Sequence, residues 1–153
     1  MVVVRDADLP ANRPPGPVVL GADGSAAGQA ATVFAFEEAA LRDVPLVTMC
    51  ALADAPGRLG EWHRIEEDFG HVVSREAKEH PEVSVVRQVL PGAPRAALLS
   101  AAADAQLLVV GARGRGGFDE MGLGSIAQAV LLYAPGPVAV IRDTAGPSGH
   151  RSA

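Results

Sequence analysis

The residues with the clearest chemical potential form one glycine-rich segment, 111–125, which reads GARGRGGFDEMGLGS. Six of its fifteen residues are glycine. Because glycine has no side chain, such a loop can direct several backbone N–H groups at one anion. Its last residues, Gly124 and Ser125, stand where a helix begins, and the dipole of a helix N-terminus favours a bound phosphate. The segment therefore predicts a phosphate-binding loop.

Alternating strand and helix patterns are expected to position this loop. The apolar run 107–110 before it predicts a buried strand, and the run 126–132 after it predicts a helix. Four further strands are predicted at 17–21, 45–52, 83–89 and 137–141. An amphipathic helix is predicted over 59–80, and a third helix opens near Pro94. This alternation predicts an α/β domain with a parallel sheet and helices on both faces.

The first helix of the domain follows residues 23–25. Its buried stripe is predicted from apolar residues at helical spacing: Ala30, Val33, Phe34 and Leu41. Asp23 and Ser25 are candidates to cap its free N–H groups. For Asp23, helix capping alone stays open as an alternative to a role in binding.

In a doubly wound sheet, ligands bind beyond the carboxyl ends of the strands, where the winding reverses. The segments 21–25 and 111–125 are the candidates to line that crevice. For Arg113 and Arg115, a solvated surface position remains the alternative to ligand contact. Asp119 and Glu120 are better explained by a solvated loop tip than by base catalysis or metal binding. No catalytic residue is predicted.

Common nucleotide and metal motifs are absent from the sequence. There is no Gly-Lys-Ser/Thr, and the turn after the first strand lacks the third glycine of the dinucleotide fingerprint. The four histidines show no metal-ligand spacing with cysteine or acidic partners. We therefore expect no metal site of the protein's own.

Composition narrows the function classes. The chain has 153 residues with a formal charge of −5, which argues against a basic nucleic-acid surface and against an anionic membrane as partner. Its single cysteine, Cys50, lies in an apolar run and excludes an intramolecular disulfide. There is no apolar run long enough to span a bilayer and no signal-peptide pattern at the N-terminus. These features predict a cytoplasmic protein.

The sequence predicts one central domain over 17–143, with residues 1–16 and 144–153 outside it. Residues 1–16 hold a short strand and a proline-rich linker, and residues 144–153 are expected to be a disordered tail. The strand VVVRD at 2–6 matches AVIRD at 139–143 in chemistry at every position. This weak repeat suggests the last strand of a preceding, similar domain, with chance similarity as the alternative. The strand is expected beside 138–142, within one chain or swapped between chains.

The loop spacing Gly-x2-Gly-x9-Gly-Ser resembles the ATP-binding motif of the universal stress protein family. The resemblance covers roughly residues 17–142. It is carried by the segments 18–25, 109–118, 122–130 and 134–142.

The resemblance implies a five-stranded parallel sheet of order 3-2-1-4-5 with four helices, similar to the adenine nucleotide alpha hydrolases. It implies an ATP-binding regulatory module of the stress response, with or without Mg²⁺, and a homodimer or tandem pseudo-dimer joined through the last strand. The alternative is a non-catalytic interaction domain without nucleotide. A slow ATPase is the least favoured function. No residue stands out as a positioned general base, and no Lys or Arg finger lies beside a Walker-type loop.

By position, the resemblance also implies the nucleotide site. Asp23 is expected near the ribose or adenine, and the backbone of Ala51 near the adenine, although Met49-Cys50-Ala51 replaces the family's more usual hydrophobic–His pair. Residues 111–114 are expected around ribose and phosphates, and 124–126 on phosphate oxygens. The complete predicted set is Gly21, Ala22, Asp23, Ala51, Val110, Gly111, Arg113, Gly114, Gly124, Ser125 and Ile126.

Overall fold

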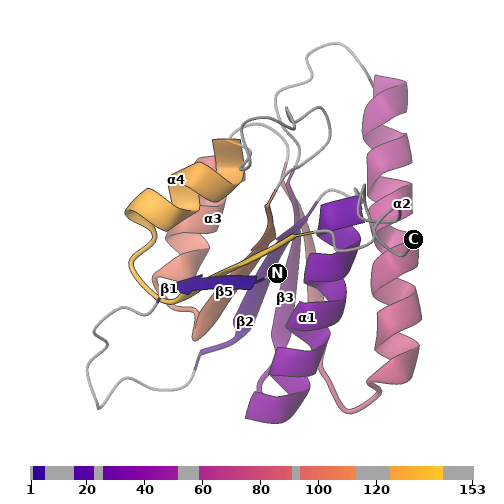
Figure 1. Cartoon of the computed structure of the whole chain (residues 1–153). Helices are drawn as coiled ribbons and strands as arrows, with labels where there is room; N and C mark the ends of the chain where they lie inside the picture. The colour runs from indigo at the N-terminus through magenta and orange to yellow at the C-terminus, as the bar shows by residue number, and fades with distance from the viewer. Residues whose placement is uncertain are drawn as a thin grey trace, which may run out of the picture.

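The computed structural model describes residues 2–5, 16–22, 26–51, 59–90, 94–112 and 125–142 (Figure 1). Strands and helices alternate along these ranges after a first strand at the N-terminus. The elements are β1 (Val2–Arg5), β2 (Val18–Ala22), α1 (Ala26–Arg42), β3 (Leu46–Ala51), α2 (Leu59–Glu79), β4 (Val85–Leu90), α3 (Pro94–Ala102), β5 (Leu107–Gly111), α4 (Ser125–Tyr133) and β6 (Val138–Ile141).

The described strands form one sheet of order β1-β6-β5-β2-β3-β4. The strands β2 to β6 are parallel to one another. Counted from β2, these five strands follow the predicted order 3-2-1-4-5, so that prediction is confirmed. β4 lies at one edge, in agreement with its more polar sequence.

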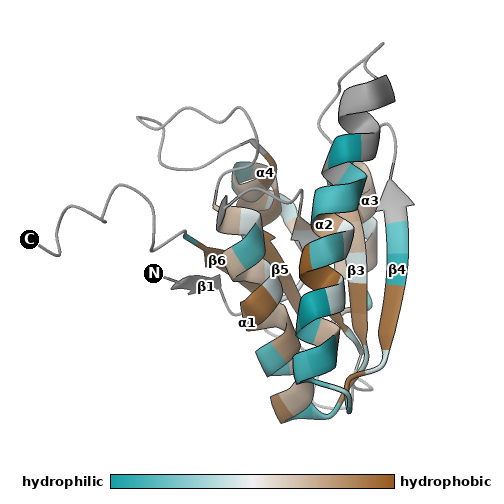
Figure 2. Cartoon of the chain, turned by 90° about the vertical axis from the view of Figure 1, so that its right-hand side faces the viewer, coloured by the Kyte–Doolittle hydropathy of each residue, from teal (hydrophilic) through white to brown (hydrophobic). Residues whose placement is uncertain are grey.

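Two apolar layers enclose the sheet, because its central strands are apolar on both faces. One layer places α1 and α2 against the sheet and includes Phe36 and Phe69. The other places α3 and α4 against the opposite face and includes Leu98 and Val130. Figure 2 shows the apolar strands between the helices and hydrophilic residues along the outer side of α2. Cys50 is buried, as predicted.

The buried stripe predicted for α1 is partly wrong. Leu41 is 80% exposed, whereas Ala31, Ala35 and Phe36 are completely buried. Phe34, which belongs to the predicted stripe, is only partly buried. α1 is rich in alanine, so its hydrophobic pattern fixes no single face, and contact with β2 and β5 decides which residues are covered.

α1 ends in a hydrogen-bonded cap around Asp43, whose φ angle is 55°. The N–H of Asp43 donates to the carbonyl of Ala40 (3.3 Å), and the N–H of Val44 donates to that of Ala39 (3.1 Å). These two bonds form a Schellman motif, which usually has glycine at the left-handed position. The chain therefore reverses into β3 with an aspartate where glycine fits best.

The amphipathic helix predicted over 59–80 is confirmed as α2, and its residues Phe69, Val72 and Val73 are buried. The following strand begins at 85 and not at 83. The N–H of Val83 donates to the carbonyl of His80 at 3.0 Å, which makes a turn before β4. In the described ranges, no helix is long and apolar enough to cross a membrane.

A hydrogen-bonded junction holds the start of the domain at Gly16. The backbone N–H of Gln106 donates to the carbonyl of Pro17 (2.8 Å). Its side-chain amide donates to the carbonyl of Gly16 (3.3 Å) and accepts from Arg42 (2.8 Å). Arg42 is also paired with Glu38 at 3.0 Å. Gln106, just before β5, and Arg42, at the end of α1, thus fix the point where the chain enters β2.

β1 pairs with β6 in the antiparallel direction, with Val2 opposite Ile141 and Arg5 opposite Val138. The expected edge-strand position beside 138–142 is therefore confirmed within a single chain. The origin of this strand in a preceding domain stays a prediction. The linker up to residue 15 and the predicted tail lie outside the described residues.

Candidate functional site

The candidate site lies at the carboxyl ends of β2 and β5, where the winding of the sheet reverses. From β2 the chain proceeds through β3 and β4 to one side, whereas β5 and β6 lie on the other. Gly21 of β2 is the register partner of Val110 in β5. Four predicted site residues, Gly21, Ala22, Val110 and Gly111, thus come together at the switch point predicted for ligand binding.

β3 brings Ala51 to the same edge, one strand further from β5. Ala22 is paired with Cys50, the residue before Ala51. Ala51 is the last residue of β3 and pairs with Leu90 of β4. Its backbone therefore lies beside the candidate crevice, and the departure from the usual hydrophobic–His pair does not move it away.

Gly111 allows β5 to touch the first turn of α1. A Cβ atom at Gly111 would lie 3.0 Å from the carbonyl carbon of Ala27 and 3.1 Å from the nitrogen of Gly28. The end of β5 and the first turn of α1 are therefore held next to each other at the crevice, because residue 111 lacks a side chain.

Gly21 has a packing role of a different kind. A Cβ atom at this position would lie 2.7 Å and 2.9 Å from the two methyl carbons of Leu98 in α3. Leu98 is completely buried, so its side chain has little room to move. Sequence reasoning missed both Leu98 and Ala27, because neither contact leaves a local signal in the sequence.

The helix after the glycine-rich segment begins where the sequence predicts it. α4 starts at Ser125, and Ile126 is half-buried against the cluster that contains Ala127 and Val130. The N-terminus of α4 thus follows directly on Gly124, in agreement with a helix dipole at the end of the loop.

The remaining predicted site residues fall outside the described part of the chain. They are Asp23, Arg113, Gly114 and Gly124, and for Ala51 and Ser125 the structure describes the backbone only. The side chains of Ala22 and Val110 are buried, 5% and 1% exposed. What the described residues offer a ligand is therefore backbone N–H and carbonyl groups. Within the described ranges, no three His, Cys, Asp or Glu side chains gather as a metal site.

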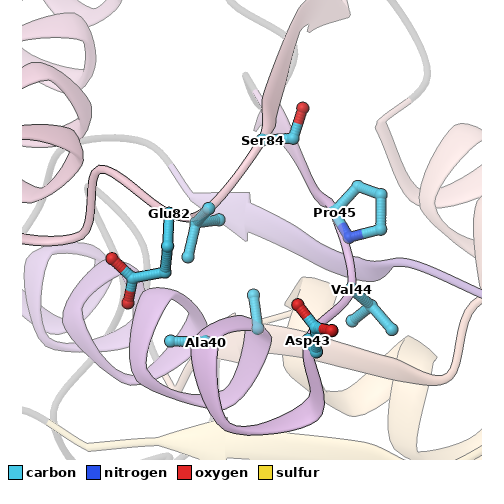
Figure 3. Close-up of a pocket in the computed structure, with 8 residues that line it drawn as sticks. Ala40, Asp43, Val44, Pro45, Glu82 and Ser84 are labelled. Atoms are coloured by element: carbon cyan, nitrogen blue, oxygen red, sulfur yellow. The ribbon is translucent and has the colours of Figure 1, made fainter.

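A small hollow of 160 Å³ lies at the other end of the strands, where β3 and β4 begin (Figure 3). It is formed where α1 turns into β3 and where the chain enters β4, and Asp43, Pro45, Glu82 and Ser84 are among its lining residues. Pockets for drug-sized ligands are usually about 300–1,000 Å³. This hollow is too small for a nucleotide and far from the strand ends that form the candidate site.

Comparison with known proteins agrees with this fold. A model of the Universal stress protein family matches residues 16–142. The chain belongs to this family. A universal stress protein of Mycolicibacterium smegmatis is 39% identical over 150 residues, covering 93% of this chain and 51% of the relative. One of Mycobacterium tuberculosis is 36% identical over 160 residues, covering 97% and 50%. This universal stress protein chain spans about half the length of these relatives.

Solved structures of universal stress proteins share the fold. A universal stress protein in complex with cAMP is 26% identical, with a TM-score of 0.62 over 84% of this chain and 98% of that one. One from Archaeoglobus fulgidus in complex with dAMP is 27% identical, with a TM-score of 0.61 over 82% and 97%. Both complexes contain an adenine nucleotide.

Proposed function

We propose that this universal stress protein domain binds an adenine nucleotide, with ATP as the preferred ligand. Its proposed role is to regulate a stress response according to whether the nucleotide is bound. One observation carries the proposal: the pairing of Gly21 with Val110 places the ends of β2 and β5 side by side at the switch point. The glycine-rich segment starts at that point and leads into the N-terminus of α4. Related structures with bound cAMP and dAMP support an adenine nucleotide as ligand.

The proposed nucleotide lies across the carboxyl edge of the sheet. Its adenine meets the backbone at Ala51 and its ribose lies near Asp23. Its phosphates are bound by N–H groups of Gly111, Gly114 and Gly124 and by the hydroxyl of Ser125. Arg113 contributes its positive charge to the phosphates. Mg²⁺ is proposed to enter with the phosphates, because in the described part of the chain no three His, Cys, Asp or Glu side chains gather to hold it.

ATP is favoured over a nucleoside because most of the proposed contacts are made to phosphate oxygens. A glycine-rich turn and a helix N-terminus both supply backbone donors and positive potential, which neutral sugars and bases exploit less. ATP and ADP should therefore bind more tightly than adenosine. The domain is proposed to hold the nucleotide without turning it over.

Calorimetric titration tests this proposal. ATP, ADP, AMP, cAMP and adenosine are titrated into the purified chain, each with and without Mg²⁺. We expect ATP to bind and Gly124→Leu to abolish binding, because a bulky side chain fills the phosphate position. Asp119→Asn, at the predicted solvated loop tip, is the matched control and should bind like the parent chain. Far-UV circular dichroism confirms that both variants are folded.

A second candidate function is a protein-interaction domain whose nucleotide site stays empty. Its support is structural, since Gly21 and Gly111 are both explained by packing against Leu98 and α1. It predicts no heat with ATP up to millimolar concentration and no nucleotide in gently purified protein. An ATPase ranks lowest. Sustained turnover that is lost in Asp23→Ala would be needed to support it.

The proposal includes pairing of two such domains through the last strand, within one longer chain or between two chains. The relatives' lengths, about twice the matched region, are compatible with a two-domain arrangement. We further propose a cytoplasmic location, because the chain's one cysteine is buried and a single cysteine forms no intramolecular disulfide.

A further inference from the structure

The small hollow at the start of β3 and β4 has a mostly apolar lining (Figure 3). Its walls come from the last turn of α1, the connection into β3 and the turn before β4. Five of its eight lining residues are apolar: Ala39, Ala40, Val44, Pro45 and Val83. A hollow of this kind favours an aliphatic group, because filling it removes apolar surface from water.

Two carboxylates from different segments also line the hollow. Asp43 follows α1 and Glu82 precedes β4, and both residues are exposed. Figure 3 shows the two side chains reaching the hollow from these separate segments. Among the described residues, neither carboxylate forms an ion pair with a lysine or an arginine. Glu82 Oε2 lies 3.7 Å from Nδ1 of His80, whose imidazole is charged only when protonated. The hollow thus joins apolar walls to two negative charges.

Asp43 is unfavourable for stability in two ways. Its φ angle of 55° suits glycine better than aspartate, and its negative charge lies at a helix C-terminus, where the helix dipole is also negative. Its carboxylate forms no hydrogen bond or ion pair with another described residue. The fold therefore gains nothing from this carboxylate within the described part of the chain, which leaves an external cation as its natural partner.

The charge of the surrounding helices also favours a cation. Residues 26–44 and 64–84 hold nine Asp and Glu side chains against four Lys and Arg. A surface with an excess of one sign raises the local concentration of the opposite charge. A metal ion fits the hollow poorly, because Ca²⁺ takes about six to eight oxygen ligands and no three acidic, His or Cys side chains gather among the described residues. An organic cation with an aliphatic part fits both the charge and the walls.

We propose that this hollow is a docking site for one lysine side chain of a partner protein. The aliphatic stem of that lysine lies on Ala40 and Val83, and its ammonium group lies between the carboxylates of Asp43 and Glu82. A hollow of 160 Å³ admits about five groups of the size of a water molecule, which takes ~30 Å³ of the liquid. This matches the four-carbon stem and ammonium group of lysine. The inference goes beyond the proposed nucleotide site and does not depend on it.

A lysine of another protein is favoured over a second copy of this chain and over an arginine. The sequence contains one lysine, Lys78, in the last turn of the acidic helix α2. A second copy would have to bring that acidic helix against this acidic surface, and like charges oppose the contact. A guanidinium binds best to one carboxylate through two parallel hydrogen bonds, whereas a compact ammonium accepts two carboxylates from separate segments.

Carbodiimide coupling to a capped trilysine peptide is the direct test. The reagent joins a carboxylate to a primary amine in contact with it, with loss of water. Peptide mapping by mass spectrometry should find the coupled peptide on Asp43 or Glu82 at least about tenfold more often than on Glu67, an exposed carboxylate of α2 outside the hollow. Coupling spread evenly over the exposed carboxylates would overturn the proposal.

Variants of the full chain measure the contribution of the two carboxylates, with NMR titration of the same peptide. Asp43→Asn with Glu82→Gln should weaken binding at least about tenfold, because both charges are removed and the side-chain shapes are kept. Asp43→Gly should also weaken binding although glycine suits the φ angle of 55°, which separates binding from folding. Glu37→Gln with Glu67→Gln is the matched control, since both residues are exposed outside the hollow. Equal weakening by both pairs would show a general charge effect and reject the proposal.

A comparison of probes identifies the bound group. Trilysine acetylated on its Nζ atoms keeps the stem without the charge and should not bind. Triarginine should bind more weakly than trilysine, and equal or tighter binding would overturn the assignment to lysine. Binding of 1,5-diaminopentane as tight as that of trilysine would point to a free diamine and contradict a protein-docking site. ATP should bind the Asp43→Asn, Glu82→Gln chain and the parent chain alike, so this test and that of the nucleotide site fail independently.

Discussion

Gly111 of β5 lies against the backbone of Ala27 in the first turn of α1, and a Cβ atom at position 111 would be 3.0 Å from the Ala27 carbonyl carbon. This contact joins the strand before the glycine-rich segment to the helix that follows the first strand. It therefore gives Gly111 a role in shaping the candidate crevice that does not depend on any ligand.

Gly111→Ala is expected to destabilise the protein by about 1–3 kcal/mol, the usual cost of overpacking a tight contact. The obstacle is helix backbone, which cannot rotate away as a side chain can. Urea unfolding measures the change. Gly136→Ala is the control, because its Cβ would meet the carbonyls of Ala102 and Ala105 at ordinary distances of 3.6 and 3.9 Å. Equal stability of the two variants would contradict the packing role.

Gly21→Ala should also destabilise by about 1–3 kcal/mol, because its new methyl group meets the buried side chain of Leu98. A double-mutant cycle with Leu98→Val identifies the cause. If the two side chains compete for one space, the double variant loses less stability than the sum of the single variants. Additive losses would instead point to strain in the β2 backbone.

Asp43→Gly should raise the free energy of unfolding by roughly 0.5 kcal/mol, because the φ angle of 55° at this helix end costs a non-glycine residue energy. Removal of a negative charge from the helix C-terminus acts in the same direction. Asp43→Val should lower stability by about 1 kcal/mol, since a β-branched residue tolerates this conformation poorly. Thermal unfolding of the two variants should shift in opposite directions.

Gly70→Ala in α2 is expected to stabilise the protein by ~0.5–1 kcal/mol, because alanine is the better helix former. The new Cβ would come 2.6 Å from a terminal nitrogen of Arg87, which is the far end of an exposed, flexible side chain. That side chain can move aside at little cost. Chemical denaturation is the measurement, and Arg87→Ala added to Gly70→Ala should leave the gain intact. A loss of stability in Gly70→Ala would show that Arg87 is held in place.

Much of the fold was predictable because its signals are local. Apolar runs bounded by glycine and proline marked β2, β3, β5 and β6, and spaced apolar residues marked α2. The alternation of these elements implied a parallel sheet and its ligand-binding edge. The same rules failed for α1, where Leu41 is exposed and Ala31 is buried, because an alanine-rich helix carries little information on which face the sheet will cover.

By itself, the sequence of this universal stress protein domain determined the order of its elements, the place of the glycine-rich segment and the start of α4 at Ser125. Only the tertiary structure showed that a Cβ atom at position 21 would collide with Leu98 and that one at position 111 would crowd the backbone of α1. It also decided that β1 runs antiparallel to β6. The physical reason is distance along the chain. Propensity and periodicity act between near neighbours, whereas these contacts join residues that the fold alone brings together.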